Sequence, residues 1–302
     1  MIIRLHQLSK TFRVPQKAPG LAGALRGLFH RRFREVRAVH SISFTINEGE
    51  LVGFLGPNGA GKTTTLKMLS GLLHPTSGEA SVLGYTPWKR ERAFQRQFTM
   101  VMGQRSQLWW DLPAWDSFLL NKEIYEIPKN QFEETVKELS DLLEIQDLLE
   151  IPVKKLSLGQ RMKAELACSL LHRPRVLLLD EPTIGLDIVM QKKVRDFILA
   201  YNQRWKATIL LTSHNMDDVS ELCSRVILIN HGRILFDGSL VQLHPVDFGQ
   251  PALVRGFTVP AHGYQRVDLV TMPEGGSSYP VQVLFASQPP PGASWNVSQA
   301  VY

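Results

Sequence analysis

A glycine-rich stretch at residues 56–64 constrains this chain more than any other feature. It fits the pattern G-x-x-x-x-G-K-[ST], follows an apolar run at residues 51–55 and precedes a helical segment that we predict at 65–73. Glycines allow a tight loop whose backbone N–H groups point inward at phosphate oxygens, and the helix that follows adds the positive end of its dipole. The pattern therefore predicts a nucleotide cradle formed by Gly56, Pro57, Asn58, Gly59, Ala60, Gly61, Lys62, Thr63 and Thr64.

Two side chains at the end of this stretch suit a triphosphate. Lys62 can reach the outer phosphates as a point charge, and the Thr63 hydroxyl can ligate Mg2+. The pattern specifies few positions, so a glycine-rich turn that binds nothing remains an alternative until other motifs are considered.

Two acidic residues, Asp180 and Glu181, follow four successive apolar residues at 176–179. Such a run is typical of a central parallel strand that is covered on both faces, and these strands present their carboxyl ends to the ligand. Beside a metal-bound phosphate, Asp180 would hold the metal through water and Glu181 would polarise the attacking water. The alternative is a strand that leaves the core with two solvated acids.

A histidine, His214, follows another predicted strand at residues 207–211. At the end of a buried strand, level with the two acids, its imidazole could sense or hold the terminal phosphate. Taken alone, a histidine in this position is more often a hydrogen-bonded loop residue.

Composition excludes several classes of protein. With 44% hydrophobic and 21% charged residues among 302, the chain is typical of a globular protein that buries a core. It contains no run of about 18 apolar residues, and its N-terminus lacks the layout of a signal peptide, so we expect a soluble, cytoplasmic chain. Cys168 and Cys223 lie in helical apolar patterns without a partner at metal spacing, which predicts two reduced core residues.

The net charge of +6 is concentrated in one segment, which we call the basic insertion, residues 14–37. It holds six basic residues and a single acid. Because nearly all of the excess positive charge lies in this one segment, the net charge does not indicate a nucleic acid partner, and we expect none. Apolar residues at helical spacing would allow a short amphipathic helix whose basic face lies near anionic lipid headgroups. A solvated surface insertion is the alternative, and charge runs more often face water.

The order of predicted elements indicates an α/β fold. Residues 3–12 and 38–46 alternate like strands and form an antiparallel β portion before the cradle, and 80–83 is a short strand after it. We assign residues 88–156 to an inserted helical subdomain, in which Phe132, Val136, Leu139, Leu142 and Leu143 form one apolar helix face. Residues 225–230 and 233–236 predict a closing hairpin.

A second anion site is predicted where Ser157 and Gly159 open a helix that runs from Gln160 to about residue 172. With it, the chain resembles the ATP-binding subunit of an ABC transporter over residues 1–240. Residues 56–64 resemble Walker A and 157–160 the family signature, although Leu158 replaces a glycine there. In the same order, Gln104 resembles the Q-loop glutamine, Asp180 and Glu181 Walker B, Asp187 the D-loop, and His214 the switch histidine.

The resemblance implies a P-loop NTPase fold of the ABC ATPase type, with a RecA-like core, an antiparallel β portion, the helical subdomain and a small β-rich extension. Residues 1–244 would form the ATP-binding domain and 245–302 the extension, which the resemblance does not cover. Phe12 stands where the family places the aromatic residue that stacks on adenine. Thr63, Gln104 and Asp180 would hold Mg2+, and Glu181, His214 and Gln104 would serve catalysis.

The resemblance also implies partners. A head-to-tail pair, made with a second copy or a homologous subunit, would sandwich two ATP molecules between the cradle of one subunit and the signature of the other. An integral membrane permease would hold the pair at the cytoplasmic face of the membrane. Residues 103–113 and 155–161 resemble the ABC-2 type export branch, including the viologen-exporter-like group. Trp109, Trp110 and Trp115 would either face this permease or pack in the helical subdomain.

Two other functions fit the sequence less well. A soluble ABC ATPase acting on ribosomes or DNA usually has tandem cassettes or long coiled-coil arms, and neither is visible in the sequence. A non-ABC P-loop kinase would need an acceptor site and would have no use for the signature. The extension at 245–302 is rich in proline and could be a small β appendage or a partly ordered tail.

Overall fold

A computed structural model of the chain describes residues 1–16, 32–103, 106–213, 215–242, 255–257, 265–271 and 279–285. Its centre is a sheet in the strand order β10-β9-β8-β3-β7-β6-β5. Within it, β5 (Phe98–Met102), β6 (Val176–Asp180), β7 (Thr208–Thr212), β3 (Leu51–Leu55) and β8 (Arg225–Asn230) run parallel to one another. Their carboxyl ends therefore lie at one edge.

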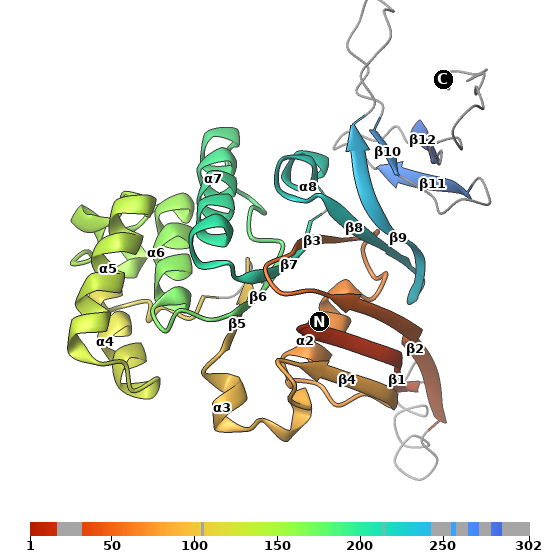
Figure 1. The fold of residues 1–302 in the computed structure, drawn as a ribbon, viewed down its shortest axis with the longest axis horizontal. Coiled ribbons are helices and arrows are strands. Elements are labelled where there is room, and N and C mark those ends of the chain that lie inside the picture. Colours follow the sequence, from red (N-terminus) through yellow and green to blue (C-terminus); the bar gives the residue numbers. More distant parts are fainter. Residues whose placement is uncertain are drawn as a thin grey trace, which may run out of the picture.

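The central strands are buried over their whole length because both faces of the sheet are covered. Leu177 and Leu179 of β6 face a helical core, and Val176 and Leu178 face a second core on the other side. The helical core contains residues of α4 (Ala114–Ile124), α5 (Lys129–Leu143), α6 (Leu158–Leu170), α7 (Ile188–Trp205) and α8 (Met216–Leu222). Figure 1 shows α4, α5 and α6 grouped on one side of the molecule.

The second core is closed by a three-stranded antiparallel sheet in the order β2-β1-β4. It consists of β1 (Ile3–Gln16), β2 (Arg32–Ile46) and β4 (Ser77–Val82), as the alternating sequence predicted for the first two. Its inner residues pack on β3 and on α2 (Lys62–Leu69), and the rings of Phe44 and Phe54 lie 5.8 Å apart. The predicted antiparallel β portion is thus confirmed.

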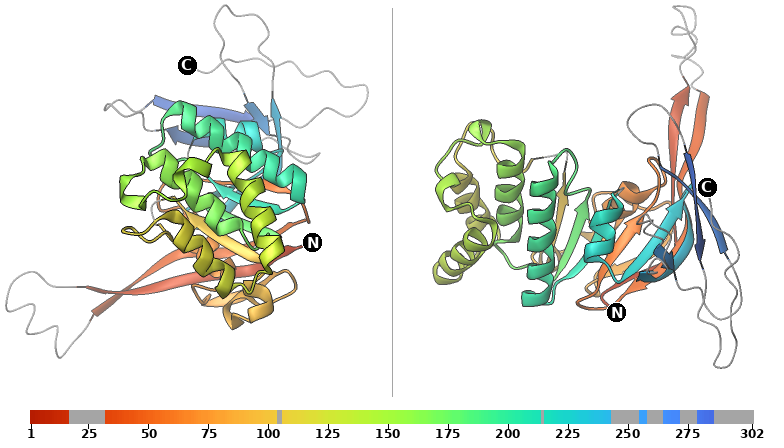
Figure 2. Two further views of the ribbon diagram at one scale, coloured as in Figure 1. Left: turned by 90° about the vertical axis from the view of Figure 1, so that its left-hand side faces the viewer. Right: turned by 90° about the horizontal axis from the view of Figure 1, so that it is seen from above.

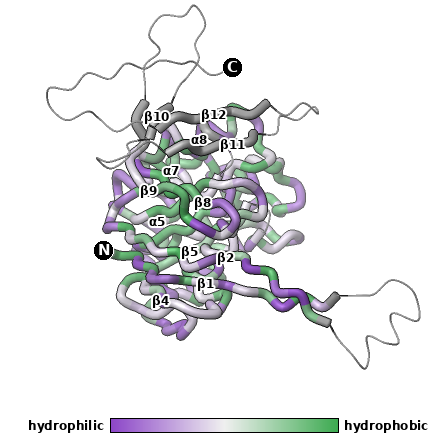
Figure 3. The backbone as a smooth tube through the Cα atoms, turned by 90° about the vertical axis from the view of Figure 1, so that its right-hand side faces the viewer, coloured by the Kyte–Doolittle hydropathy of each residue, from purple (hydrophilic) through white to green (hydrophobic). Residues whose placement is uncertain are grey.

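The strands β1 and β2 extend further than expected. Beyond Phe12, which pairs with Val36, the pairing continues to Gln16 and Arg32. This part projects from the body of the molecule in both views of Figure 2, and it contains both hydrophilic and hydrophobic residues (Figure 3). The two ends of the basic insertion are therefore paired strand rather than helix, because cross-strand hydrogen bonds fix residues 14–16 and 32–37. Residues 17–31, the rest of that prediction, lie outside the described residues.

Helix and strand boundaries correct two further expectations. The range 88–156 contains η1 (Pro87–Lys89), α3 (Arg92–Gln95), η2 (Gln146–Leu148) and η3 (Val153–Lys155), but also β5, which hydrogen-bonds with β6 in the central sheet. Burial alternates along this strand: Thr99 and Val101 are buried, and the residues on either side of them are partly buried. Helix α2 begins at Lys62, not at residue 65, because the left-handed Gly61 ends the loop directly before it.

The C-terminal part follows the predicted hairpin. β8 pairs antiparallel with β9 (Arg233–Gln242) across His231 and Gly232. β9 also pairs with β10 (Arg255–Phe257), and β11 (Gln265–Thr271) pairs with β12 (Tyr279–Phe285). Cys168 and Cys223 are buried and free, as expected. Within the described ranges, no helix combines the length and apolar character that a membrane crossing requires.

One buried histidine makes the fold sensitive to acid. The Nε2 of His172 donates a hydrogen bond to the Phe98 carbonyl oxygen at 3.2 Å, and the ring stacks on Tyr125 with centroids 3.9 Å apart. Burial lowers the pKa of His172 from 6.5 to about 4, and the Phe98 carbonyl only partly opposes this.

We predict that His172→Gln reduces the acid sensitivity of folding. As the pH falls from 6.5 to 4, the unfolded chain binds this proton before the folded chain does, so His172 costs the wild type roughly 3 kcal/mol of stability over that range. Urea unfolding at pH 7.5 and at pH 4.5 measures the loss. An equal loss in the wild type and the variant would contradict the burial of a neutral imidazole.

Candidate functional site

The glycine-rich loop turns between β3 and α2 in a space that side chains could not share. A Cβ on Gly56 would stand 2.0 Å from the Ile229 carbonyl oxygen of β8. Gly61 has a φ of 111°, which side-chain-bearing residues rarely adopt, and its Cβ would stand 2.6 Å from the Ala38 carbonyl oxygen. The loop is thus held against β8 on one side and the start of the antiparallel sheet on the other.

Lys62, the first residue of α2, is buried beneath this loop. Its Nζ donates hydrogen bonds to the carbonyl oxygens of Gly56 at 2.6 Å and Pro57 at 3.2 Å. Burial lowers the pKa of the Lys62 ammonium, while the carboxylates of Glu181 and Asp180 act in the opposite direction. The structure therefore brings the predicted lysine and the two predicted acids into one electrostatic neighbourhood.

The two acids are arranged by the end of β7. Asp180 is the last residue of β6 and lies opposite Thr212 in the parallel register. The Thr212 hydroxyl donates to Asp180 Oδ1 at 2.6 Å, and the Glu181 N–H donates to the carbonyl oxygen of Thr212 at 3.1 Å. Glu181 itself has a φ of 52°, a left-handed conformation that is uncommon for a non-glycine residue. These contacts turn the chain sharply between the two carboxylates.

Thr212 was missed by the sequence analysis as a site residue. The sequence feature that could have identified Thr212 is its position at the end of a predicted strand, level with Asp180. Of the predicted residues, Gln104 and His214 lie outside the described residues, and their roles stay predictions. Their chain neighbours are described: the Gly103 N–H donates to the Asp180 carbonyl oxygen at 3.0 Å, and Ser213 follows Thr212 directly.

The signature segment caps helix α6. The Gln160 N–H donates to Ser157 Oγ at 3.2 Å, and the Ser157 N–H donates to Gln160 Oε1 at 2.9 Å. This reciprocal pair is a capping box. Ser157 therefore opens the helix as predicted, but α6 begins at Leu158, two residues before the predicted Gln160, and ends at Leu170. Because α6 packs in the helical core and α2 in the second core, the segment and the cradle belong to opposite faces of the sheet.

The D-loop aspartate performs a similar capping role next to the signature. Asp187 Oδ1 accepts a hydrogen bond from the Met190 N–H at 2.8 Å at the start of α7. Met190 in turn fills the space beside Gly159, where a Cβ would stand 2.6 Å from its Cγ. The side chain of Leu158 lies over Gly185. The signature and the start of α7 are therefore packed as one surface.

Phe12 sits at the base of the projecting hairpin. It pairs with Val36, and the Lys10 ammonium lies 5.3 Å from the centre of its ring. Val39, three residues beyond Val36, lies beside Gly61 of the loop. The strand that carries the partner of Phe12 thus runs past the cradle, which agrees with an aromatic residue near the base of a bound nucleotide.

The side chains at this edge suit Mg2+ only together with a phosphate. The described ranges contain no group of three or more His, Cys, Asp or Glu residues that could hold a metal ion. Thr63 and Asp180 supply one hydroxyl and one carboxylate, the hard oxygen donors that Mg2+ accepts while keeping water and phosphate ligands. The donor set therefore fits the predicted ion as a companion of bound nucleotide.

Comparison with known proteins identifies relatives over most of the chain. Residues 39–184 match the family described as ABC transporter. The ABC transporter ATP-binding protein NatA of Bacillus subtilis is 35% identical over 71% of this chain and 88% of its own length. The Nod factor export ATP-binding protein I of Burkholderia lata is 36% identical, over 69% of this chain and 68% of that protein.

A longer relative is covered only in part. The probable multidrug ABC transporter ATP-binding protein YbhF of Escherichia coli is 34% identical over 69% of this chain, which spans 36% of that protein. Among solved structures, a dimeric ATP-binding cassette in a post-hydrolysis state with ADP and Pi has a TM-score of 0.65 at 21% identity, over 78% of this chain and 98% of that chain. This likeness shows the fold.

We predict that Gly159→Ala destabilises the folded chain through Met190. The added methyl group would meet the Met190 side chain, and overpacking of this kind costs about 1–3 kcal/mol. Combining it with Met190→Ala should remove that cost, since alanine otherwise favours a helix over glycine. Thermal unfolding of both single variants and the double variant measures the effect. An equal loss of stability in both backgrounds would show that Met190 is not the obstacle.

Proposed function

This chain belongs to the ABC transporter family, and we propose that it forms a head-to-tail pair that binds two ATP molecules and drives a separate membrane permease. ATP binding and hydrolysis in transport are the activity of the family. The observation that carries the proposal is the common edge where the glycine-rich loop, Lys62, Asp180 and Glu181 meet. Backbone donors and one ammonium can bind a phosphate chain, and two acids can hold its metal ion and orient the attacking water.

The pairing is supported by the separation of the two anion sites within one chain. The cradle belongs to the core closed by the antiparallel sheet, and Ser157 begins a helix of the opposite core. Beside Ser157, the apolar side chains of Leu158, Ile188 and Val189 are 44%, 80% and 67% exposed. Such a patch next to a polar cap fits burial against a second copy or a homologous subunit.

Within the pair, we assign one role to each of the predicted site residues. Lys62 would exchange its loop carbonyl partners for the outer phosphates, while Thr63, Gln104 and Asp180 would hold Mg2+. When bound, Mg2+ supplies positive charge at the phosphate oxygens. Glu181, oriented by Thr212, would orient and polarise the attacking water, and His214 would contact the terminal phosphate. Phe12 would stack on adenine.

The helical side carries the surface that we assign to the permease. Trp109 and Trp110 are 56% and 51% exposed, whereas Trp115 packs on Phe132 with ring centres 5.8 Å apart. Near α4, a cavity of about 510 Å3 is lined by three arginines and by Glu126, which pairs with Arg96. A permease segment with an acidic and an apolar face suits this cavity, and its docking would place the chain at the cytoplasmic face of the membrane.

Export is the direction that we propose for transport. Relatives with more than 30% identity include proteins named for Nod factor export and for bacitracin transport. The names of the relatives also favour transport over a soluble ATPase that acts on ribosomes or DNA. The transported substrate would be selected by the permease.

We predict that Glu181→Gln traps an ATP-bound dimer. The amide keeps the shape of the side chain but cannot accept a proton from water, so turnover should fall by at least about 100-fold while ATP still binds. Phosphate release and size-exclusion chromatography with ATP measure the two effects. Turnover at the wild-type rate would refute the role of Glu181.

A second prediction concerns the permease surface. Trp109→Ala should abolish copurification of the membrane partner and leave the ATP turnover of the isolated chain within about twofold, because an exposed aromatic anchor contributes to binding more than to folding. Phe33→Ala is the matched control, since Phe33 is 54% exposed on the distant hairpin. Retention of the partner by Trp109→Ala would assign the docking surface elsewhere.

A further inference from the structure

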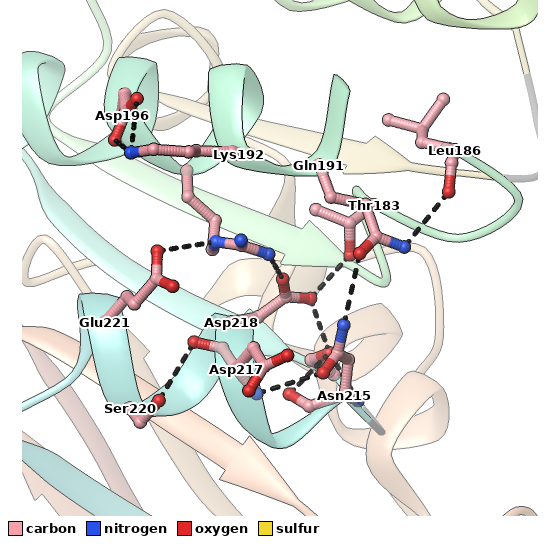
Figure 4. A network of polar contacts seen from close by, with 12 residues as sticks. Thr183, Leu186, Gln191, Lys192, Asp196, Asn215, Asp217, Asp218, Ser220 and Glu221 are labelled. Carbon is pink, nitrogen blue, oxygen red and sulfur yellow. Dashed lines mark hydrogen bonds and ion pairs between the residues drawn. The ribbon is translucent and has the colours of Figure 1, made fainter. Parts of the chain in front are cut away.

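A buried carboxylate outside the nucleotide edge collects three hydrogen bonds from three parts of the chain. Asp218 of α8 is 0% exposed. Its Oδ2 accepts from the Thr183 hydroxyl at 2.5 Å and from the Ser213 hydroxyl at 2.8 Å, and its Oδ1 accepts from Arg195 Nη1 at 2.9 Å. Figure 4 shows the Asp218 carboxylate below the labelled Thr183, with a dashed line that marks the bond between them.

The three donors come from the segments that carry the proposed catalytic groups. Thr183 lies two residues after Glu181, and Ser213 directly precedes His214. Arg195 belongs to α7, whose N-cap is the D-loop residue Asp187. One side chain therefore joins the loop after Walker B, the segment before the switch histidine and the D-loop helix.

A second set of contacts runs parallel to the first. Gln191 of α7 donates from Nε2 to the Leu186 carbonyl oxygen at 3.1 Å and accepts at Oε1 from Asn215 Nδ2 at 3.3 Å. Asn215 follows His214 in the chain, and its N–H donates to Ser213 Oγ at 2.9 Å. The residues on both sides of His214 are thus hydrogen-bonded within this network (Figure 4).

The buried charge of Asp218 is balanced by a buried guanidinium. Arg195 is buried and donates to Asp218 from Nη1 and to Glu221 Oε2 from Nε at 2.8 Å. Glu221 is half-exposed and touches neither Thr183 nor Ser213 in the described residues. A buried ion pair is weak evidence for stability alone, because its desolvation cost offsets much of the attraction. A positional role explains better why three segments converge on one carboxylate.

We propose that Asp218 is a positioning residue for ATP hydrolysis, holding the loop after Glu181 and the segment before His214 in one arrangement with α7. This proposal rests on the roles assigned above to Glu181 and His214. Small displacements of catalytic groups cost large factors in rate, because the reacting atoms must be held within tight limits. Asp218 therefore affects the chemical step and leaves nucleotide binding to the cradle.

The test uses substitutions that keep shape and remove single hydrogen bonds. Thr183→Val removes the hydroxyl that donates a hydrogen bond to Asp218, and Thr183→Ser keeps this hydroxyl. Asp218→Asn presents an amide donor toward groups that are themselves donors. Glu221→Gln is the control, because it alters the other partner of Arg195 without touching either loop. Each full-length variant is measured for kcat and KM of ATP hydrolysis, for ATP binding by calorimetry and for thermal unfolding.

We expect Thr183→Val and Asp218→Asn to lower kcat at least tenfold, with ATP affinity within about twofold of the wild type. Thr183→Ser should recover most of kcat, and Glu221→Gln should stay within about twofold. If Asp218→Asn fails to fold, the comparison of Thr183→Val with Thr183→Ser decides alone.

Three results would overturn the proposal. These are an unchanged kcat in Thr183→Val, a loss that Thr183→Ser does not recover, and a rise in KM with kcat unchanged. Glu181→Gln serves as the reference for the proposed function. Normal turnover in Glu181→Gln refutes the catalytic assignment itself, whereas a loss there with normal turnover in Thr183→Val refutes only the role of Asp218.

Discussion

Parallel pairing of β3, β7 and β6 is the constraint on which the rest of the structure depends. Thr212 lies opposite both Phe54 and Asp180, so three strands end level with one another. The loop after β3, the two acids at the end of β6 and Thr212 at the end of β7 must then lie side by side. Residues more than a hundred positions apart in the chain become neighbours through backbone register alone. The surrounding helices mainly keep this register by burying both faces of the sheet.

Features that depend on local pattern could be predicted from the sequence. The loop at residues 56–64, the buried strand before Asp180 and the Ser157 cap each follow from a few adjacent residues. Features that depend on distant partners could not. The Thr183–Asp218 hydrogen bond joins residues 35 positions apart, and no sequence pattern around either residue predicts the other as its partner. Strand β5 was hidden in a helical region because only its pairing with β6 makes it a strand.

The separation of the two cores shapes how the chain can work. The parallel strands of the sheet send alternate side chains into different cores, one closed by helices and one closed by the antiparallel sheet. The nucleotide edge draws on both, since Lys62 begins a helix of one core and Thr183 and Asp218 border the other. Side-chain hydrogen bonds therefore connect the loop after Glu181 to α7 and α8, whereas the glycine loop lies against β8.

The carbonyl partners of Lys62 have a consequence for affinity. Its ammonium already donates to the Gly56 and Pro57 oxygens, so an arriving anion competes with bonds that the loop supplies itself. The net gain is the difference between charge-assisted bonds to phosphate and the bonds to two neutral carbonyl oxygens, and not the full strength of the phosphate bonds. This competition lowers the net affinity of the cradle, which suits repeated binding and release of nucleotide better than permanent retention.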